Sequence, residues 1–223
     1  MVGEAATRTV AAAGRPAHQR HASGRVTPAP QPHAFYAPLQ RCLDVLLSVI
    51  LLLVALPLVA VACLAILATS RQAPLLLQRR VGWLGREFTL LKLRTMRDEG
   101  EARGSLGAKP VYDERVTAVG RLLRRTSIDE LPQLLNVLAG QMTLVGPRPG
   151  LPSEVEEYRP AWLRRLSVKP GLTGLWQVSG RSALPLERWM ALDRAYLMRR
   201  STSSDLLILL RTVPAVISMR GAW

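Results

Sequence analysis

The sequence predicts a mostly helical α+β protein that is held to a membrane near its N-terminus. Three observations carry this prediction. Residues 45–70 contain no charged side chain, two apolar runs flank a turn with glycines at residues 82 and 85, and prolines precede several later segments. A long uncharged run is typical of a membrane helix, and the other two patterns are typical of a β-hairpin and of helix starts.

The membrane segment, residues 45–70, would form a helix of roughly 39 Å, which is enough to cross a hydrocarbon core of about 30 Å. Pro57 lies near its middle, where the missing N–H kinks a helix. Arg41 precedes the segment, and Arg71 and Arg80 follow it. Because basic residues favour the cytosolic side, neither end prefers the outer face. Two topologies stay equally open: a helix that bends at Pro57 and returns, or a kinked single span.

The chain divides into three predicted parts. Residues 1–34 are rich in Ala, Pro and Gly and have no apolar period, so we expect a disordered basic tail. Residues 35–72 hold the membrane helix, and residues 73–223 form a domain that is long enough to bury a core. Within this domain, the glycine-rich residues 100–107 are expected to form a loop.

The charge of the chain points to an anionic partner. The formal net charge is +14, and of 30 basic residues only Lys92, Lys109 and Lys169 are lysines. Guanidinium groups pair with phosphate through two parallel hydrogen bonds, so a phosphate-bearing partner is expected. Coding bias combined with attraction to anionic lipids explains the same composition equally well. The apolar segment argues against nucleic acid as the partner.

Several classes of chemistry are excluded. The histidines, His18, His21 and His33, all fall in the predicted tail, which removes Ser–His and Cys–His nucleophile systems and histidine metal sites from the folded domain. The chain has no GxxxxGK or GxGxxG phosphate loop. Cys42 and Cys63 form no CxxC pattern, which fits a reducing cytosol.

The domain's elements follow from local signals. Residues 75–94 predict a hairpin with its turn at Gly82 and Gly85, and residues 116–125 predict a short helix. Another helix is expected to begin near Pro132. Residues 169–181 contain several turn-forming residues and are expected to form a loop.

A further helix begins at Pro185 and places Asp193 on its apolar face. A carboxylate there needs a partner, so Asp193 is either an arginine-paired strut or a site residue. The apolar residues 205–219 either pack on the core or lie along the membrane.

The acidic pair Asp129 and Glu130 stands just before Pro132, with arginines on its approach and Arg148 between two prolines after it. Carboxylates set among guanidiniums at a helix start suit the handling of phosphate groups and a divalent cation. Ser127-x-x-Glu130 also matches a capping box, which is the purely structural alternative for Glu130.

Four motifs in order resemble the bacterial sugar transferase family, the small monotopic polyprenyl-phosphate sugar-1-phosphate transferases. They are KLRTM at residues 92–96, RLLRRTSIDELPQLLNVLAGQMTLVGPRP at residues 121–149, KPGLTGLWQVSGRS at residues 169–182, and Asp193-x-x-Tyr196. The resemblance covers residues 41–212, most of the chain. It departs from the family at Gln141, where an acidic residue is usual.

The resemblance implies a function and a site. Asp129 would be the nucleophile that attacks the sugar-bearing phosphate of a UDP-sugar, with release of UMP and formation of a phosphosugar-aspartyl intermediate. Polyprenyl phosphate would then accept the sugar phosphate, which starts the assembly of a surface polysaccharide. Glu130 would bind Mg²⁺. The side chains expected to line the substrate site are Lys92, Arg94, Arg124, Arg148, Arg181 and Asp193.

The resemblance also implies that the membrane helix re-enters the same face at Pro57. The catalytic domain would then lie on the cytoplasmic face of the inner membrane. The identity of the sugar and any homo-oligomer are left open. The alternative from another class is a catalytically inactive, membrane-tethered protein that binds anionic lipid or partner glycosyltransferases.

Overall fold

The computed structural model describes residues 26–97, 113–219 and 221. Its helices and strands are α2 (Tyr36–Ser70), β1 (Leu75–Val81), β2 (Glu87–Leu93), α3 (Ala118–Thr126), α4 (Gln133–Leu138), β3 (Thr143–Val145), α5 (Pro152–Glu156), β4 (Gly171–Thr173), α6 (Leu175–Val178), α7 (Leu186–Arg199) and α8 (Thr202–Ile217). Short 3₁₀ turns are η1 (Trp83–Gly85), η2 (Ile128–Glu130), η3 (Leu163–Ser167) and η4 (Arg181–Ala183). The predicted mostly helical α+β class is confirmed. The loop expected at residues 100–107 and the tail up to residue 25 lie outside the described residues.

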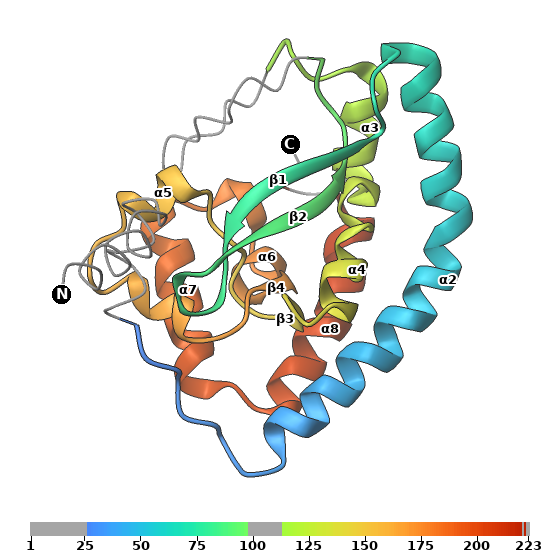
Figure 1. The fold of residues 1–223 in the computed structure, drawn as a ribbon. Coiled ribbons are helices and arrows are strands. Elements are labelled where there is room, and N and C mark those ends of the chain that lie inside the picture. Colours follow the sequence, from blue (N-terminus) through green and yellow to red (C-terminus); the bar gives the residue numbers. More distant parts are fainter. Residues whose placement is uncertain (1–25, 98–112, 220, 222–223) are drawn as a thin grey trace, which may run out of the picture.

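The long helix α2 curves along one side of the rest of the protein (Figure 1). Its inward face carries small or polar side chains, such as Ser48, Ala55 and Ala62, and these are buried. Its outward face is apolar and exposed, with Leu46, Leu53, Val54, Leu56, Val61 and Leu64. Only 17% of its most apolar window is buried, although the helix is long and apolar enough to cross a membrane. Such a surface is stabilised in lipid by about 25 cal/mol per Å².

The chain that leads into α2 forms no helix or strand over residues 26–34, yet it lies against the body. The Ala29 N–H donates to Ser167 O at 3.0 Å, and Arg200 Nη2 donates to Ala29 O at 3.2 Å. Val26 packs beside the buried cluster around Tyr158 and Met190. These residues therefore form part of the surface next to the start of α2.

The predicted hairpin is confirmed by the antiparallel pairing of β1 and β2, which runs from Leu75 opposite Leu93 to Val81 opposite Glu87. Gly85 takes a φ of +75° at the turn, a conformation that glycine adopts without strain. Strand alternation buries Leu93 and directs the neighbouring Lys92 to the opposite face.

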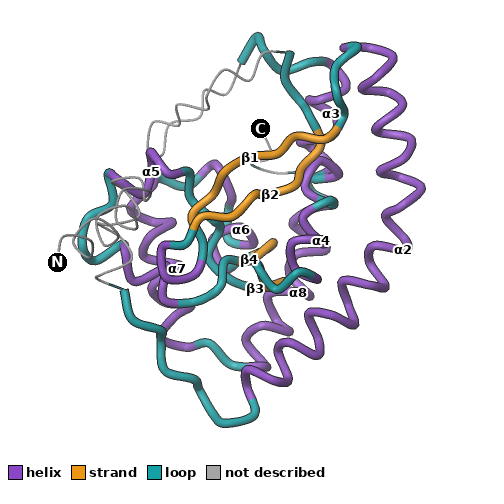
Figure 2. Tube along the Cα trace, viewed as in Figure 1, coloured by secondary structure: helices purple, strands orange, loops and turns teal. Residues whose placement is uncertain are grey.

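The small parallel sheet is the main departure from prediction (Figure 2). Strands β3 and β4 pair in register, with Thr143 opposite Gly171 and Val145 opposite Thr173. Residues 169–181, expected to be a loop, thus contain β4 and α6, so that expectation is wrong. A strand of three residues is too short to show the alternation on which sequence reasoning depends.

The core lies between α4, the small sheet and the C-terminal helices. Its buried members are Leu90, Leu134, Val137, Met142, Leu144, Val145, Tyr196 and Ile208. Helix α8 contributes Ile208 to this core and leaves Leu206, Leu210, Val213 and Ile217 exposed on its other side. One face of α8 therefore packs on the core, and the other presents an apolar surface to the surroundings.

Candidate active site

The acidic pair lies in the turn η2, between α3 and α4. Ser127 ends α3 with a left-handed φ of +59°, and Pro132 directly precedes α4, as predicted. The capping-box alternative is wrong because Ser127 makes no side-chain cap bond, and its Oγ instead accepts from Arg181 Nη2 at 3.2 Å. Glu130 is therefore directed to the site rather than to the helix end.

Asp129 is a buried carboxyl group, with only 8% of the residue exposed. Burial, followed by the nearby Glu130 charge, raises the pKa of Asp129 to about 7, while Lys92, Arg124 and Arg148 act in the opposite direction. Poor solvation leaves a carboxylate more reactive than it would be in water. The surrounding cations still allow the ionised form to exist in the folded protein.

Arg148 forms an ion pair with Glu130, with 2.6 Å between Nη2 and Oε1. Its loop is held through the backbone: Arg165 Nη2 donates to Arg148 O at 2.8 Å, and Arg80 Nη1 donates to Pro149 O at 3.1 Å. The two flanking prolines restrict the loop further. The Arg148 guanidinium is therefore fixed before a substrate arrives.

Arg124 reaches the site because α3 rests directly on the chain that follows β2. A Cβ at Gly120 would stand 2.0 Å from Thr95 O, so only glycine allows this approach. Arg124 Nε then donates to Thr95 Oγ1 at 2.9 Å. Lys92, a half-buried residue of β2, contributes its positive charge to Asp129.

Arg181 enters the site from η4, with a left-handed φ of +53°. Its backbone oxygen accepts from Trp189 Nε1 at 3.1 Å, and its guanidinium bonds the Ser127 hydroxyl. Burial lowers the pKa of Arg181, and the charge on Glu130 counteracts this effect. The structure thus brings Lys92, Arg124, Arg148 and Arg181 to the acidic pair.

Arg94 and Asp193 are placed differently. Arg94 Nε donates to Ala73 O at 2.8 Å, in the chain that leaves α2. Asp193 is 2% exposed and lies 2.8 Å from Arg165 Nη2, although within the described residues its Oδ2 accepts no well-aligned hydrogen bond. Burial raises the pKa of Asp193 to about 6, against the effect of Arg165. Asp193 therefore does not line the site itself. It pairs with Arg165, which in turn holds the loop of Arg148.

Sequence reasoning missed Arg80 and Arg165 as parts of the site. Arg80 donates to Gln78 Oε1 through Nε (3.1 Å) and Nη2 (2.7 Å), and burial together with the Arg148 charge lowers its pKa to about 10. The spacing of Gln78 and Arg80, two apart on one strand face, was a usable signal. The need of Asp193 for a cation predicted a partner, but nothing singled out Arg165 among so many arginines.

A divalent cation fits this site in one particular way. No cluster of three or more His, Cys, Asp or Glu side chains occurs within the described part of the chain. Mg²⁺, however, is often held by one or two carboxylates together with substrate phosphates. Glu130, whose side chain is 22% exposed beside the buried Asp129, offers hard oxygen ligands of this kind.

The long apolar helix and the acidic pair among guanidinium groups fit a membrane-associated enzyme that acts on phosphate groups. The chain belongs to the bacterial sugar transferase family, whose model matches residues 35–219.

Three named relatives support this assignment. The chain is 37% identical to the exopolysaccharide production protein ExoY of Rhizobium meliloti over 198 residues, which cover 82% of this chain and 88% of ExoY. It is 42% identical over 196 residues to the UDP-glucose:undecaprenyl-phosphate glucose-1-phosphate transferase of Caulobacter vibrioides, covering 82% and 72%. It is 36% identical over 200 residues to the undecaprenyl-phosphate galactose phosphotransferase of Salmonella typhimurium, covering 83% and 42%.

Proposed function

We propose that this chain transfers a sugar 1-phosphate from a UDP-sugar to polyprenyl phosphate, with release of UMP, and so initiates the assembly of a surface polysaccharide. The names of the relatives, which specify glucose or galactose phosphate and undecaprenyl phosphate, support the reaction class. The observation that carries the proposal is the buried carboxyl group of Asp129, set beside Glu130 among Lys92, Arg124 and Arg148.

The reaction would proceed in two displacements at one phosphorus atom. An oxygen of the Asp129 carboxylate bonds to the phosphorus that carries the sugar, and the bond from that phosphorus to the UMP oxygen breaks, so UMP leaves with the electron pair. A phosphate oxygen of the lipid then attacks the same phosphorus and releases Asp129. Two steps through a carboxylate avoid the direct approach of one anionic substrate to the other.

The guanidinium groups would offset the charge on the transferring phosphate. Arg148 is positioned by its ion pair with Glu130 and by two hydrogen bonds that Arg165 and Arg80 donate to the backbone of its loop. Groups that are fixed in advance stabilise developing charge without reorganising during the reaction. A Mg²⁺ ion held by Glu130 and by substrate phosphates would supply further charge neutralisation.

We further propose that α2 enters the membrane and returns to the cytoplasmic face. Both of its ends contact the same body: Tyr36 OH donates to Asp205 Oδ2 at 2.7 Å, and Ile66 packs with Leu93 and Leu123. A single span would carry one of these contacts through the bilayer. The apolar face of α8 would lie on the same lipid surface.

The reaction is tested with the full chain in detergent, Mg²⁺, polyprenyl phosphate and a panel of UDP-sugars, with UMP release as the readout. Asp129→Asn is expected to abolish release, because an amide is no nucleophile at phosphorus. Glu157→Gln, on an exposed side chain at the end of α5, is the control and should act as the wild type does. Activity in the Asp129→Asn variant would exclude Asp129 as the nucleophile, and the panel itself identifies the sugar.

A further inference from the structure

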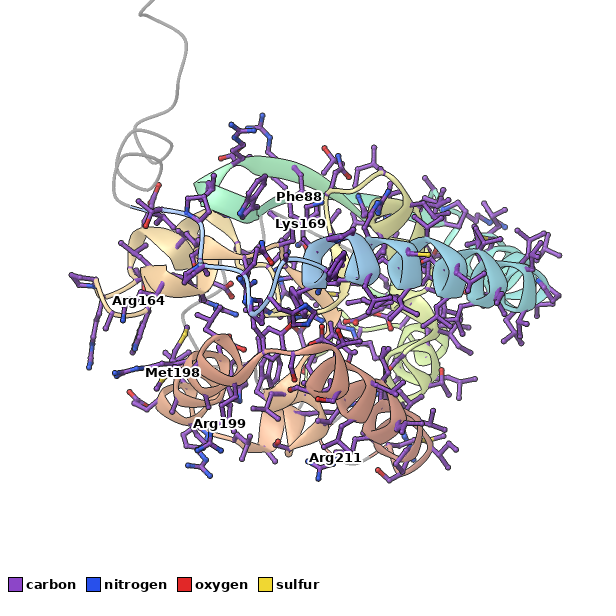
Figure 3. All side chains as sticks on the ribbon, turned by 90° about the horizontal axis from the view of Figure 1, so that it is seen from below. Phe88, Arg164, Lys169, Met198, Arg199 and Arg211 are labelled. Carbon is purple, nitrogen blue, oxygen red and sulfur yellow. The ribbon has the colours of Figure 1, made fainter. Side chains whose placement is uncertain are left out.

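A polar cavity lies at the start of α2, and the acidic pair is not part of it. Its volume is about 220 Å³, and its lining includes three cations, Arg41, Lys169 and Arg200, with Trp83 at the hairpin tip. Asp129 and the cations around it do not belong to this lining. Figure 3 shows Lys169 beside the beginning of α2.

The cavity carries an excess of positive charge. Lys169 is half-buried, and among the described residues its ammonium group makes no hydrogen bond. Arg41 donates to Val137 O and Leu138 O, both at 2.7 Å, which fixes its guanidinium at the end of α4. Asp44 is the acidic residue of the lining; its charge interacts with Arg41 and Lys169, and its Oδ1 accepts from Thr143 Oγ1 and Leu144 N–H, so one carboxylate faces three cations. A half-buried ammonium group without an acceptor favours the binding of an anion.

An apolar groove continues from this cavity between α2 and α8. Its walls include Leu43, Leu47, Leu206 and Leu209. The cavity and the groove share the lining residues Gln40, Asp44, Thr143 and Val145. A cationic pocket that opens into an apolar groove matches an amphiphile with an anionic head and a hydrocarbon tail.

We propose that this composite site binds an anionic phospholipid of the bilayer, with its phosphate at Lys169 and Arg41 and an acyl chain between α2 and α8. The inference rests on the proposed insertion of α2 into a membrane and is independent of the proposed transfer reaction. The acceptor lipid is a different ligand, because its phosphate must reach Asp129. A bound phospholipid would join the start of α2 to α8 and to the small sheet.

The test uses the full chain in a neutral detergent, titrated with short-chain phosphatidylglycerol and followed by native mass spectrometry and by the melting temperature. Lys169→Met should raise the Kd for phosphatidylglycerol about tenfold, the value of one charge-assisted contact. Lys169→Arg should retain binding, which separates loss of charge from loss of fold. Arg211→Met removes an exposed charge from α8 that points outward (Figure 3), and it should bind as the wild type does.

Three further arms can overturn the inference. Equal binding of phosphatidylcholine would show that the cations do not select the ligand. Equal stabilisation by inorganic phosphate would replace the lipid by a free anion. Asp129→Asn should bind phosphatidylglycerol normally. Loss of binding in that variant, or displacement of the lipid by a UDP-sugar, would show that the lipid binds at the acidic pair instead. A failure of UMP release in the earlier assay leaves this result unaffected.

Discussion

At the scale of single residues, Asp129 combines burial with the need for a negative charge. The same burial that raises its pKa to about 7 keeps water away from the carboxylate oxygens. Natural active sites often hold such unfavourable groups at the expense of stability. Both the rate of the reaction and the stability of the fold should therefore respond to this residue.

The first response is a dependence of the reaction on pH. Because the pKa is raised, the protonated and non-nucleophilic form of Asp129 predominates below about pH 7. Initial rates of UMP release should therefore fall as the pH is lowered from about 8 to about 6. A rate that stays flat over this range would contradict the assignment of Asp129 as a nucleophile with a raised pKa.

The second response concerns stability. Asp129→Asn removes a charge that the fold disfavours, so the inactive variant should melt higher than the wild type at pH 8, by roughly 3 °C. Asp113 offers the opposite case, because hydrogen bonds from Arg115 lower its pKa to about 2. Asp113→Asn should not raise the melting temperature. Thermal unfolding of the two variants side by side tests the pair of expectations.

At the scale of elements, the close contact between α3 and the end of β2 positions Arg124. Gly120→Ala would place a Cβ 2.0 Å from the backbone oxygen of Thr95, so the helix must move. We expect the free energy of unfolding to fall by about 2 kcal/mol. UMP release should fall by more than this loss of stability explains, because the shifted helix moves Arg124. Arg121→Ala, an exposed change on the same helix, is the control. Wild-type activity in the Gly120→Ala variant would show that α3 does not set the position of Arg124.

The elements with local signals could be predicted, and those that depend on tertiary contacts could not. The hairpin was visible from its glycines, and the helices after Pro132 and Pro185 were visible from their prolines. The approach of β3 to β4 depends on a glycine at residue 146, because a Cβ there would stand 2.7 Å from Lys169 O. No local pattern reveals a contact of that kind.

The candidate site divides in the same way. The acidic pair and Arg148 were visible because they are adjacent to helix-start and turn signals. Arg80 and Arg165 act on the backbone of a loop far away in sequence, which only the folded chain reveals.

Gln141, the departure from the family pattern, still offers an acceptor, since its Oε1 accepts from Asn136 Nδ2 at 2.7 Å.

At the scale of the whole molecule, the two ends of α2 are expected on one side of the membrane. Phe35→Cys and Arg71→Cys, each in a chain with Cys42 and Cys63 replaced by alanine, place single thiols at exposed positions just outside this helix. A membrane-impermeant thiol reagent should label both thiols only after the cytoplasmic face is opened. Labelling of one of them in intact cells would establish a true span.

The hydrogen bond from Tyr36 to Asp205 joins residues 169 positions apart. A ribosome that adds about 5 to 20 residues per second needs roughly 8 to 34 seconds to cover that interval. During synthesis, the apolar helix is therefore finished long before the carboxylate that secures its first turn exists. With α2 in the membrane as proposed, insertion into lipid should precede docking, and the nascent protein should remain an anchored but open chain until α8 leaves the ribosome.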